Sequence, residues 1–175
     1  MGGFEGGDEG GFWDIDILPS LIHQQNASKP VDKAKFYIEK SDIGYSTKAH
    51  VKAKTTGHDG STYVEDLYDT ISFVPCKCNA FTIEGCDDIP LESNTIYKAF
   101  NALNDFTNEP DILDFFFEHK VIVTKRIPVL AGYGGASSDA ASFIHLVKEV
   151  CNLILTRDEL DRIARIVGPK VPSFI

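Results

Sequence analysis

The residues with the clearest chemical potential form a glycine-rich stretch at positions 127–141, Ile-Pro-Val-Leu-Ala-Gly-Tyr-Gly-Gly-Ala-Ser-Ser-Asp-Ala-Ala. Its three glycines let the backbone approach a ligand closely and adopt positive φ angles. A helix that begins after such a loop presents unpaired N–H groups and a partial positive charge, which attract anions. Ser137 and Ser138 add hydroxyls for a phosphate oxygen or for a helix cap. The stretch predicts a phosphate-binding loop, and the alternative is a tight turn with a serine cap.

A strand and an amphipathic helix are expected on either side of this stretch. The β-branched residues of 120–125 predict a strand before it. After it, apolar residues recur at helical spacing and define one face of a helix, formed by Ala140, Phe143, Ile144, Val147, Val150 and Cys151. The polar residues Asp139, His145 and Lys148 are expected away from that face.

The rest of the sequence from Ala34 predicts a mixed α and β domain. Strands are expected at 35–39, 49–56, 69–74 and 80–84. Helices are expected behind a cap at Asn94, over 111–119, and after a capping box formed by Thr156 and Glu159, ending at Gly168. The apolar residues 171–175 predict a further strand.

Length and charge restrict the class of protein. The chain has 175 residues, 43% of them hydrophobic, which fits one domain with a real core. Its 26 acidic and 17 basic residues give a net charge of −9, which argues against a nucleic-acid partner. No apolar run reaches the ~20 residues of a membrane span, and the acidic start lacks the features of a targeting peptide. We therefore expect a cytoplasmic protein without a membrane or nucleic-acid partner.

Residues 1–30 differ in composition from the remainder. They hold six of the 14 glycines, and before Lys29 their only charges are acidic. This composition predicts a flexible acidic arm, followed by a domain over 31–175. Within the arm, 12–18 alternates apolar and acidic residues. That segment is a candidate edge strand or a docking segment for a protein partner, and the alternatives are a strand of its own domain or a leader.

The four cysteines, Cys76, Cys78, Cys86 and Cys151, are expected to be free thiols. A metal site made from the first three with His58 or His50 is the alternative. However, one residue separates Cys76 from Cys78, where zinc sites usually have two to four. We therefore expect no metal site within the protein.

The stretch Pro128 to Ala141 resembles the second signature motif of the GHMP kinases (galacto-, homoserine, mevalonate and phosphomevalonate kinases). Support comes from Leu91 to Ala99, from Glu149 to Leu153 and from Asp158 to Leu160, so the resemblance covers roughly Ser46 to Ile175. It implies an α+β fold, the ribosomal protein S5 domain 2-like sandwich of a GHMP kinase N-terminal domain, with the family's C-terminal domain absent from this chain. Among these kinases the chain most resembles an isoprenoid-biosynthesis branch whose small-molecule substrate carries a cytidyl group.

The resemblance also implies roles for individual residues, with ATP and Mg²⁺ as cofactors. ATP is expected to contact Pro128, Val129, Leu130, Ala131, Gly132, Tyr133, Gly134, Gly135, Ala136, Ser137 and Ser138. Lys48 stands at the position of the catalytic lysine, which stabilises charge on a transferring phosphoryl group. His50 and Tyr63 stand at substrate-binding positions, and Tyr63 corresponds to the aromatic residue that stacks on the cytosine ring.

One departure from the family pattern concerns catalysis directly. Lys170 stands where the family has the aspartate that takes the proton of the attacking hydroxyl. A protonated amine cannot act as a general base unless its pKa is strongly lowered. The sequence therefore leaves two hypotheses, an ATP-dependent kinase with impaired activity or a non-catalytic nucleotide-binding or structural relative.

Overall fold

The structure is a computed structural model that describes residues 36–128 and 133–175. The predicted acidic arm 1–30, its alternating segment 12–18 and the four residues Val129–Gly132 of the glycine-rich stretch lie outside the described residues.

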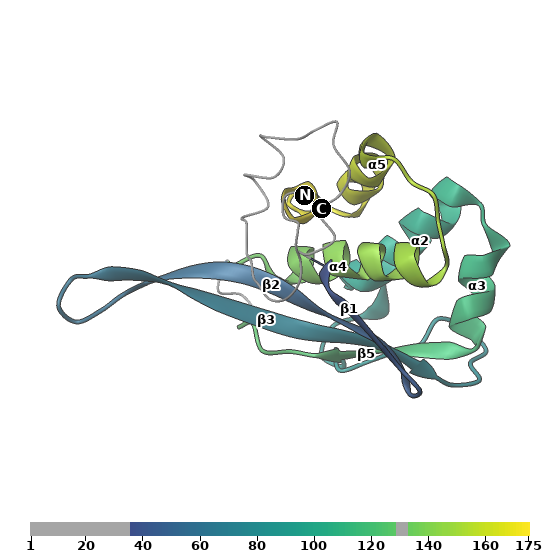
Figure 1. Ribbon diagram of the computed structural model, residues 1–175, viewed down its shortest axis with the longest axis horizontal. Helices are drawn as coiled ribbons and strands as arrows, with labels where there is room; N and C mark the ends of the chain where they lie inside the picture. The colour runs from purple at the N-terminus through teal and green to yellow at the C-terminus, as the bar shows by residue number, and fades with distance from the viewer. Residues whose placement is uncertain (1–35, 129–132) are drawn as a thin grey trace.

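A five-stranded sheet forms one layer of the molecule, with the strand order β1-β2-β3-β5-β4. The strands are β1 (Ile38–Ser41), β2 (Gly44–Thr56), β3 (Thr62–Pro75), β4 (Ile83–Glu84) and β5 (His119–Thr124). All neighbouring pairs are antiparallel except β4 and β5, which are parallel. The β2-β3 hairpin extends well beyond the helices in Figure 1.

The helices form the second layer, on one face of the sheet (Figure 1). They are α2 (Thr95–Thr107), α3 (Pro110–Phe117), α4 (Gly135–Val150) and α5 (Arg157–Val167), with short 3-10 turns η2 (Leu91–Ser93) and η3 (Val171–Phe174). Side chains in β2 alternate accordingly, since Ala49, Val51 and Ala53 are buried while Lys48, His50 and Lys52 are not. The mixed α+β class predicted from the sequence is confirmed.

Helix α4 is buried on nearly all sides, because it lies between the sheet and the other helices. Its residues from Ser138 to Val147 are all buried. Asp139 and His145, which are expected away from the apolar face, are buried as well, at only 3% and 6% exposed. Helical periodicity separates one apolar face from a polar face, but it does not show that neighbouring elements cover both.

Several predicted boundaries also change. Strand β1 begins at Ile38, β2 and β3 are longer than expected, and the strand predicted over 80–84 keeps only Ile83 and Glu84. The helix predicted over 111–119 ends at Phe117, because His119 already pairs in β5 with Pro75. The caps at Asn94 and at Thr156 with Glu159 are confirmed.

The C-terminal residues form a turn and not the predicted strand. In η3 the backbone N–H of Ile175 donates to the carbonyl of Pro172 at 3.3 Å, and that of Ser173 donates to Lys170 at 3.2 Å. Pro172 has no N–H to give to a sheet ladder, and its fixed φ suits the first turn of a helix. The apolar side chains of Val171 and Ile175 are buried against the helical layer instead.

None of the helices within the described ranges combines the length and apolarity needed to cross a membrane.

We predict that Phe116→Ala lowers the free energy of unfolding by about 3–5 kcal/mol. Its ring is 1% exposed and meets those of Phe73 and Phe143 with centroids 5.1 and 5.7 Å away. The neighbouring Phe117 is 43% exposed, so Phe117→Ala is a matched control expected to cost about 1 kcal/mol or less. Urea unfolding of both variants measures the difference, and equal losses would contradict the packing described here.

Candidate functional site

The site begins where the chain turns from β5 into α4. Gly134 caps α4 with φ at +84°, and a Cβ on Gly135 would meet Ile127 Cγ2 at 2.9 Å, so both positions require glycine. No side chain within residues 36–128 and 133–175 caps the helix, and the first N–H to donate within it is that of Ser138, to Gly134 O at 2.9 Å. The alternative of a serine cap is therefore wrong. The uncapped end can accept an anion.

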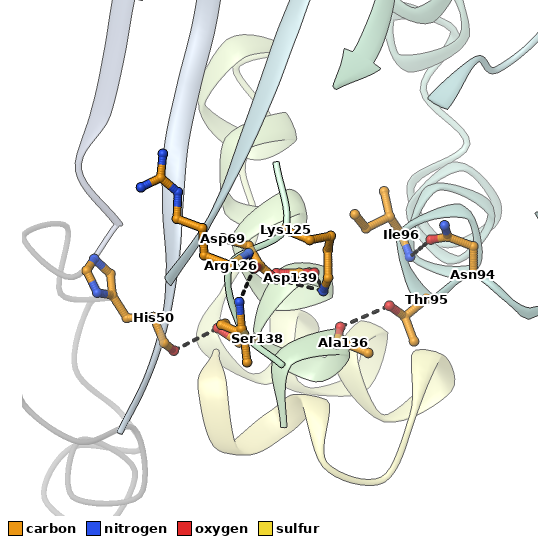
Figure 2. A network of polar contacts seen from close by, with 11 residues as sticks. His50, Asp69, Asn94, Thr95, Ile96, Lys125, Arg126, Ala136, Ser138 and Asp139 are labelled. Carbon is orange, nitrogen blue, oxygen red and sulfur yellow. Dashed lines mark hydrogen bonds and ion pairs between the residues drawn. The ribbon is translucent and has the colours of Figure 1, made fainter. Parts of the chain in front are cut away.

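A buried carboxylate anchors the segment that leads into the glycine-rich stretch (Figure 2). Asp69 Oδ1 accepts the backbone N–H groups of Arg126 at 2.6 Å and Ile127 at 2.8 Å. The ammonium group of Lys125 donates to Asp69 Oδ2 at 2.7 Å. Since Asp69 is completely buried at the core face of β3, these three bonds hold the segment after β5 against the sheet.

The same lysine joins this anchor to α4. Lys125 Nζ lies 2.9 Å from Asp139 Oδ2, and the side chain of Asp139 is only 4% exposed. Asp139 Oδ1 has no hydrogen-bond partner among the described residues. Strand β3, the β5-α4 connection and the first turns of α4 are thus tied together by one ammonium group between two carboxyls.

The pKa values of the two carboxyls are shifted in opposite directions from the usual aspartate value. Burial favours the neutral form of Asp69, but hydrogen bonds with Asp139, Ile127, Lys125 and Arg126 outweigh it and hold the pKa of Asp69 below its usual range. Burial and the neighbouring Asp69 raise the pKa of Asp139 well above its usual range, against the opposing effect of Lys125. The site therefore pairs an ionised carboxylate with a carboxyl that binds a proton strongly.

Strand β2 reaches the start of α4 through its backbone. The hydroxyl of Ser138 donates to the carbonyl oxygen of His50 at 2.8 Å (Figure 2). The imidazole of His50 lies on the opposite face of the sheet, where Nδ1 is 3.1 Å from both oxygens of Asp66. Lys48 lies on that face too, with Nζ 4.7 Å from the ring centroid of Tyr68. No described contact joins the Lys48 side chain to the helix end.

Tyr63 is not brought to the same place as Lys48 and His50. It pairs with Thr55, whereas His50 pairs with Tyr68 five residues further along β3, a separation of about 17 Å along the strand. The register also places Tyr63 on the opposite face of the hairpin, where its side chain is exposed. The aromatic side chain that does lie beside Lys48 is Tyr68, which also accepts a hydrogen bond from Arg126 at 3.3 Å.

Lys170 lies in the segment that returns to α4. It is exposed and immediately precedes η3, which packs against α4. The ring of Phe174 lies so close to Gly134 that a Cβ there would meet it at 3.0 Å. Phe174 and Gly134, which are 40 positions apart in the chain, are therefore neighbours in space.

The thiols behave as the sequence predicted. All four cysteines are free, with Cys86 buried and the others half-buried. No group of three or more His, Cys, Asp or Glu side chains with metal-binding geometry occurs within 36–128 and 133–175.

Sequence reasoning missed Asp69, Lys125 and Tyr68. A signal for the first was present, because Asp69 precedes Ile71 and Phe73 at period two and therefore shares their core face. A carboxylate at such a position needs buried partners, which points to a network. Nothing in the sequence identified Lys125 as that partner, since it looks like an ordinary lysine at the end of a strand.

The fold agrees with comparisons to known proteins. The family model for the N-terminal domain of GHMP kinases matches residues 94–173, from the cap of α2 to η3. The mevalonate kinase structure from Methanococcus jannaschii is similar with a TM-score of 0.52 at 17% identity, over 72% of this chain and 46% of that one. The chain contains a GHMP kinase N-terminal domain and belongs to that family, which confirms the resemblance and the fold expected from it.

More similar sequences come from one branch of this family. A protein of Sulfurovum sp. (strain NBC37-1) is 43% identical over 143 residues, covering 75% of this chain and 55% of that protein. One of Sulfurimonas denitrificans is 44% identical over 116 residues, covering 64% and 44%. Both are named 4-diphosphocytidyl-2-C-methyl-D-erythritol kinase. The chain spans about half the length of the curated relatives it matches.

We predict that Asp69→Ala lowers the free energy of unfolding by about 3–5 kcal/mol, because it leaves Lys125 and two backbone N–H groups without their acceptor. Asp66→Ala is the matched control, since Asp66 is exposed and its pairing with His50 is worth about 0–1 kcal/mol. Denaturant unfolding at pH 7 compares the two. A small loss for Asp69→Ala would show that the anchor does not carry the stability assigned to it.

Proposed function

We propose that this chain forms the nucleotide-binding part of an ATP-dependent small-molecule kinase that acts on 4-diphosphocytidyl-2-C-methyl-D-erythritol. The proposal rests mainly on the N-terminus of α4, which no described side chain caps and which begins at the two obligatory glycines Gly134 and Gly135 within the matched GHMP kinase domain. The substrate is taken from the names of the two relatives. Isoprenoid biosynthesis and a cytoplasmic location follow from the same proposal.

The polyphosphate of ATP would lie at the start of α4. The donor groups available there are the backbone N–H groups of Gly135, Ala136 and Ser137, together with the hydroxyl of Ser137, and such donors suit phosphate oxygens. Pro128 and Tyr133 would border the nucleotide, and Val129–Gly132 complete the proposed loop. Mg²⁺ would be held chiefly by the phosphates of the nucleotide, and we assign no side chain of the chain to it.

Bound ATP supplies the phosphoryl group, and the protein contributes position and charge. The dipole of α4 stabilises negative charge on the phosphates. By resemblance Lys48 would stabilise the group in transfer. Its ammonium group lies by Tyr68 on the sheet face opposite α4, so this role would require the side chain to turn toward the helix end. By resemblance His50 and Tyr63 would contact the substrate, and the exposed ring of Tyr63 is available for stacking. Because the two side chains lie on opposite faces of the β2-β3 hairpin, a single substrate would reach both only if the hairpin rearranged.

A second candidate function is a nucleotide-binding relative without catalysis. The observation that favours it is the exposed Lys170, which stands at the general-base position and is not desolvated. A lysine ammonium group has no lone pair with which to accept the proton of a hydroxyl. Both candidates share nucleotide binding, and they differ in turnover.

Binding can be tested at the helix cap. We predict that millimolar Mg-ATP raises the melting temperature of the wild-type protein, and that Gly134→Ala weakens the affinity by about tenfold or more. The new Cβ combines a disfavoured φ with a 3.0 Å contact to Phe174. Gly60→Ala is a matched control, because Gly60 has the same φ of +84° and open space around it. Absence of any shift in the wild-type protein would remove the proposal of a phosphate site.

Turnover can be tested at the general-base position. Labelled ATP and the cytidyl acceptor are expected to give little product with the wild-type chain. Lys170→Asp should raise turnover by about 10²–10⁴-fold over any detectable baseline, the usual contribution of a general base. Lys77→Asp makes the same charge change at an exposed position away from the site and should have no effect. An unchanged or lower rate for Lys170→Asp would count against its assignment to that position.

A further inference from the structure

The buried network beside the helix end has more negative charge than one lysine can neutralise. Lys125 Nζ lies 2.7 Å from Asp69 Oδ2 and 2.9 Å from Asp139 Oδ2. The two carboxylic side chains are only 0% and 4% exposed. Two carboxylates with one ammonium group would leave a net charge of −1 out of contact with water, which is strongly unfavourable.

One bound proton would neutralise the excess negative charge and would allow a hydrogen bond at the unpaired oxygen of Asp139. The oxygens of Asp69 already accept three hydrogen bonds, which favours its ionised form. Asp139 Oδ1 has no partner among the described residues, and both carboxyls contact the same ammonium group, so the two carboxyls lie beside one another. Two carboxyls can form a hydrogen bond only if one of them holds a proton. The geometry therefore assigns that proton to Asp139.

We propose that Asp139 holds a proton shared with Asp69, and that this proton is coupled to the binding of a polyphosphate at the N-terminus of α4. The coupling rests on the proposed function. Asp139 is four residues into α4 from Gly135, about 6 Å along the helix axis. A phosphate at the helix end would repel an ionised Asp139 across a poorly screened interior.

The coupling is reciprocal. If a polyphosphate favours the protonated form of Asp139, protonated Asp139 favours the polyphosphate by the same factor. Asp139 would thus be a positioning residue. In its neutral form it keeps Lys125 paired with Asp69, and Asp69 holds Arg126 and Ile127 in place ahead of the glycine-rich stretch. Ionised Asp139 would compete with Asp69 for the same ammonium group.

Other titratable groups around α4 must be distinguished from Asp139. Cys86, after β4, is buried and electrostatically coupled to both Lys125 and Asp139, and burial raises the pKa of its thiol. Asp88 lies close enough to influence that thiol. On the β2 side, the ring of His50 is turned to Asp66 on the far face of the sheet. Two further helices packed against α4 also carry charged side chains. On α2 they are the exposed Lys98 and Asp105, and on α5 they are Arg157, Asp158, Glu159, Asp161, Arg162 and Arg165. The exposed Lys170 precedes η3, and the buried His145 lies on α4 itself, six residues beyond Asp139.

The first experiment measures ATP affinity by calorimetry from pH 6 to pH 9 for the wild-type protein, Asp139→Asn and Cys86→Ser. Asparagine reproduces the shape and neutrality of protonated aspartate. Wild-type affinity should fall by up to about tenfold per pH unit above the pKa of Asp139, while that of Asp139→Asn should not show this fall. Cys86→Ser should follow the wild-type curve. Titration of the ATP phosphates is common to all three proteins and cancels in the ratios.

The second experiment follows the carboxyl carbon of Asp139 by ¹³C NMR, without nucleotide, in the full chain. Asp139 is expected to titrate well above the usual aspartate range of about 4. In Asp69→Asn the titration should move to lower pH, because the neighbouring negative charge is gone. This second variant keeps the test decisive if Asp139→Asn does not fold.

The outcomes separate this inference from the proposed function. Normal titration of Asp139 near pH 4 would overturn the shared proton. ATP binding with parallel pH curves for wild type and Asp139→Asn would overturn the coupling and leave nucleotide binding intact. No ATP binding at any pH would overturn the coupling together with the proposed function, while the NMR titration would still decide the shared proton.

Discussion

The rest of the site depends on one constraint: the buried carboxylate of Asp69 must accept hydrogen bonds that compensate its charge. A charge at that depth is tolerated only with full compensation, and the compensation comes from Lys125 and from the backbone of Arg126 and Ile127. These donors belong to the segment that enters the glycine-rich stretch. Because the buried charge of Asp69 must be compensated by these donors, it determines where the segment leaves the sheet.

The position of α4 follows from the same constraint. Lys125 also contacts Asp139, and the Ser138 hydroxyl contacts the backbone of β2, so the first turns of the helix are tied to both long strands. No described side chain caps the end of the helix, and glycine is needed at both Gly134 and Gly135, where the helix starts. The binding capacity of the helix end is therefore left unused by the described residues, while the helix body is held rigidly in the core.

Much of the local structure could be predicted because it depends on short-range patterns. The caps of α2 and α5 require particular residues at fixed spacing, and both are present as expected. The differences between expectation and structure concern residues whose environment is set by elements distant in the sequence. Asp139 and His145 look polar and exposed by helical periodicity but are buried by elements distant in sequence. Residues 171–175 look like a strand, although Pro172 and the packing of η3 against α4 make them a turn.

The glycine-rich stretch, the strand and helix around it, the mixed α+β class and the resemblance to GHMP kinases could all be recognised in the sequence, because spacing and residue type carry these properties directly. Which charged side chains meet became visible only in the folded chain. The tertiary structure brought Asp69, Lys125 and Asp139 together from β3, the β5-α4 connection and α4, and it placed Phe174 against Gly134. It also placed Tyr63 away from His50, because strand register sets both the face and the distance. Such contacts depend on how the chain folds back on itself, which local patterns do not encode.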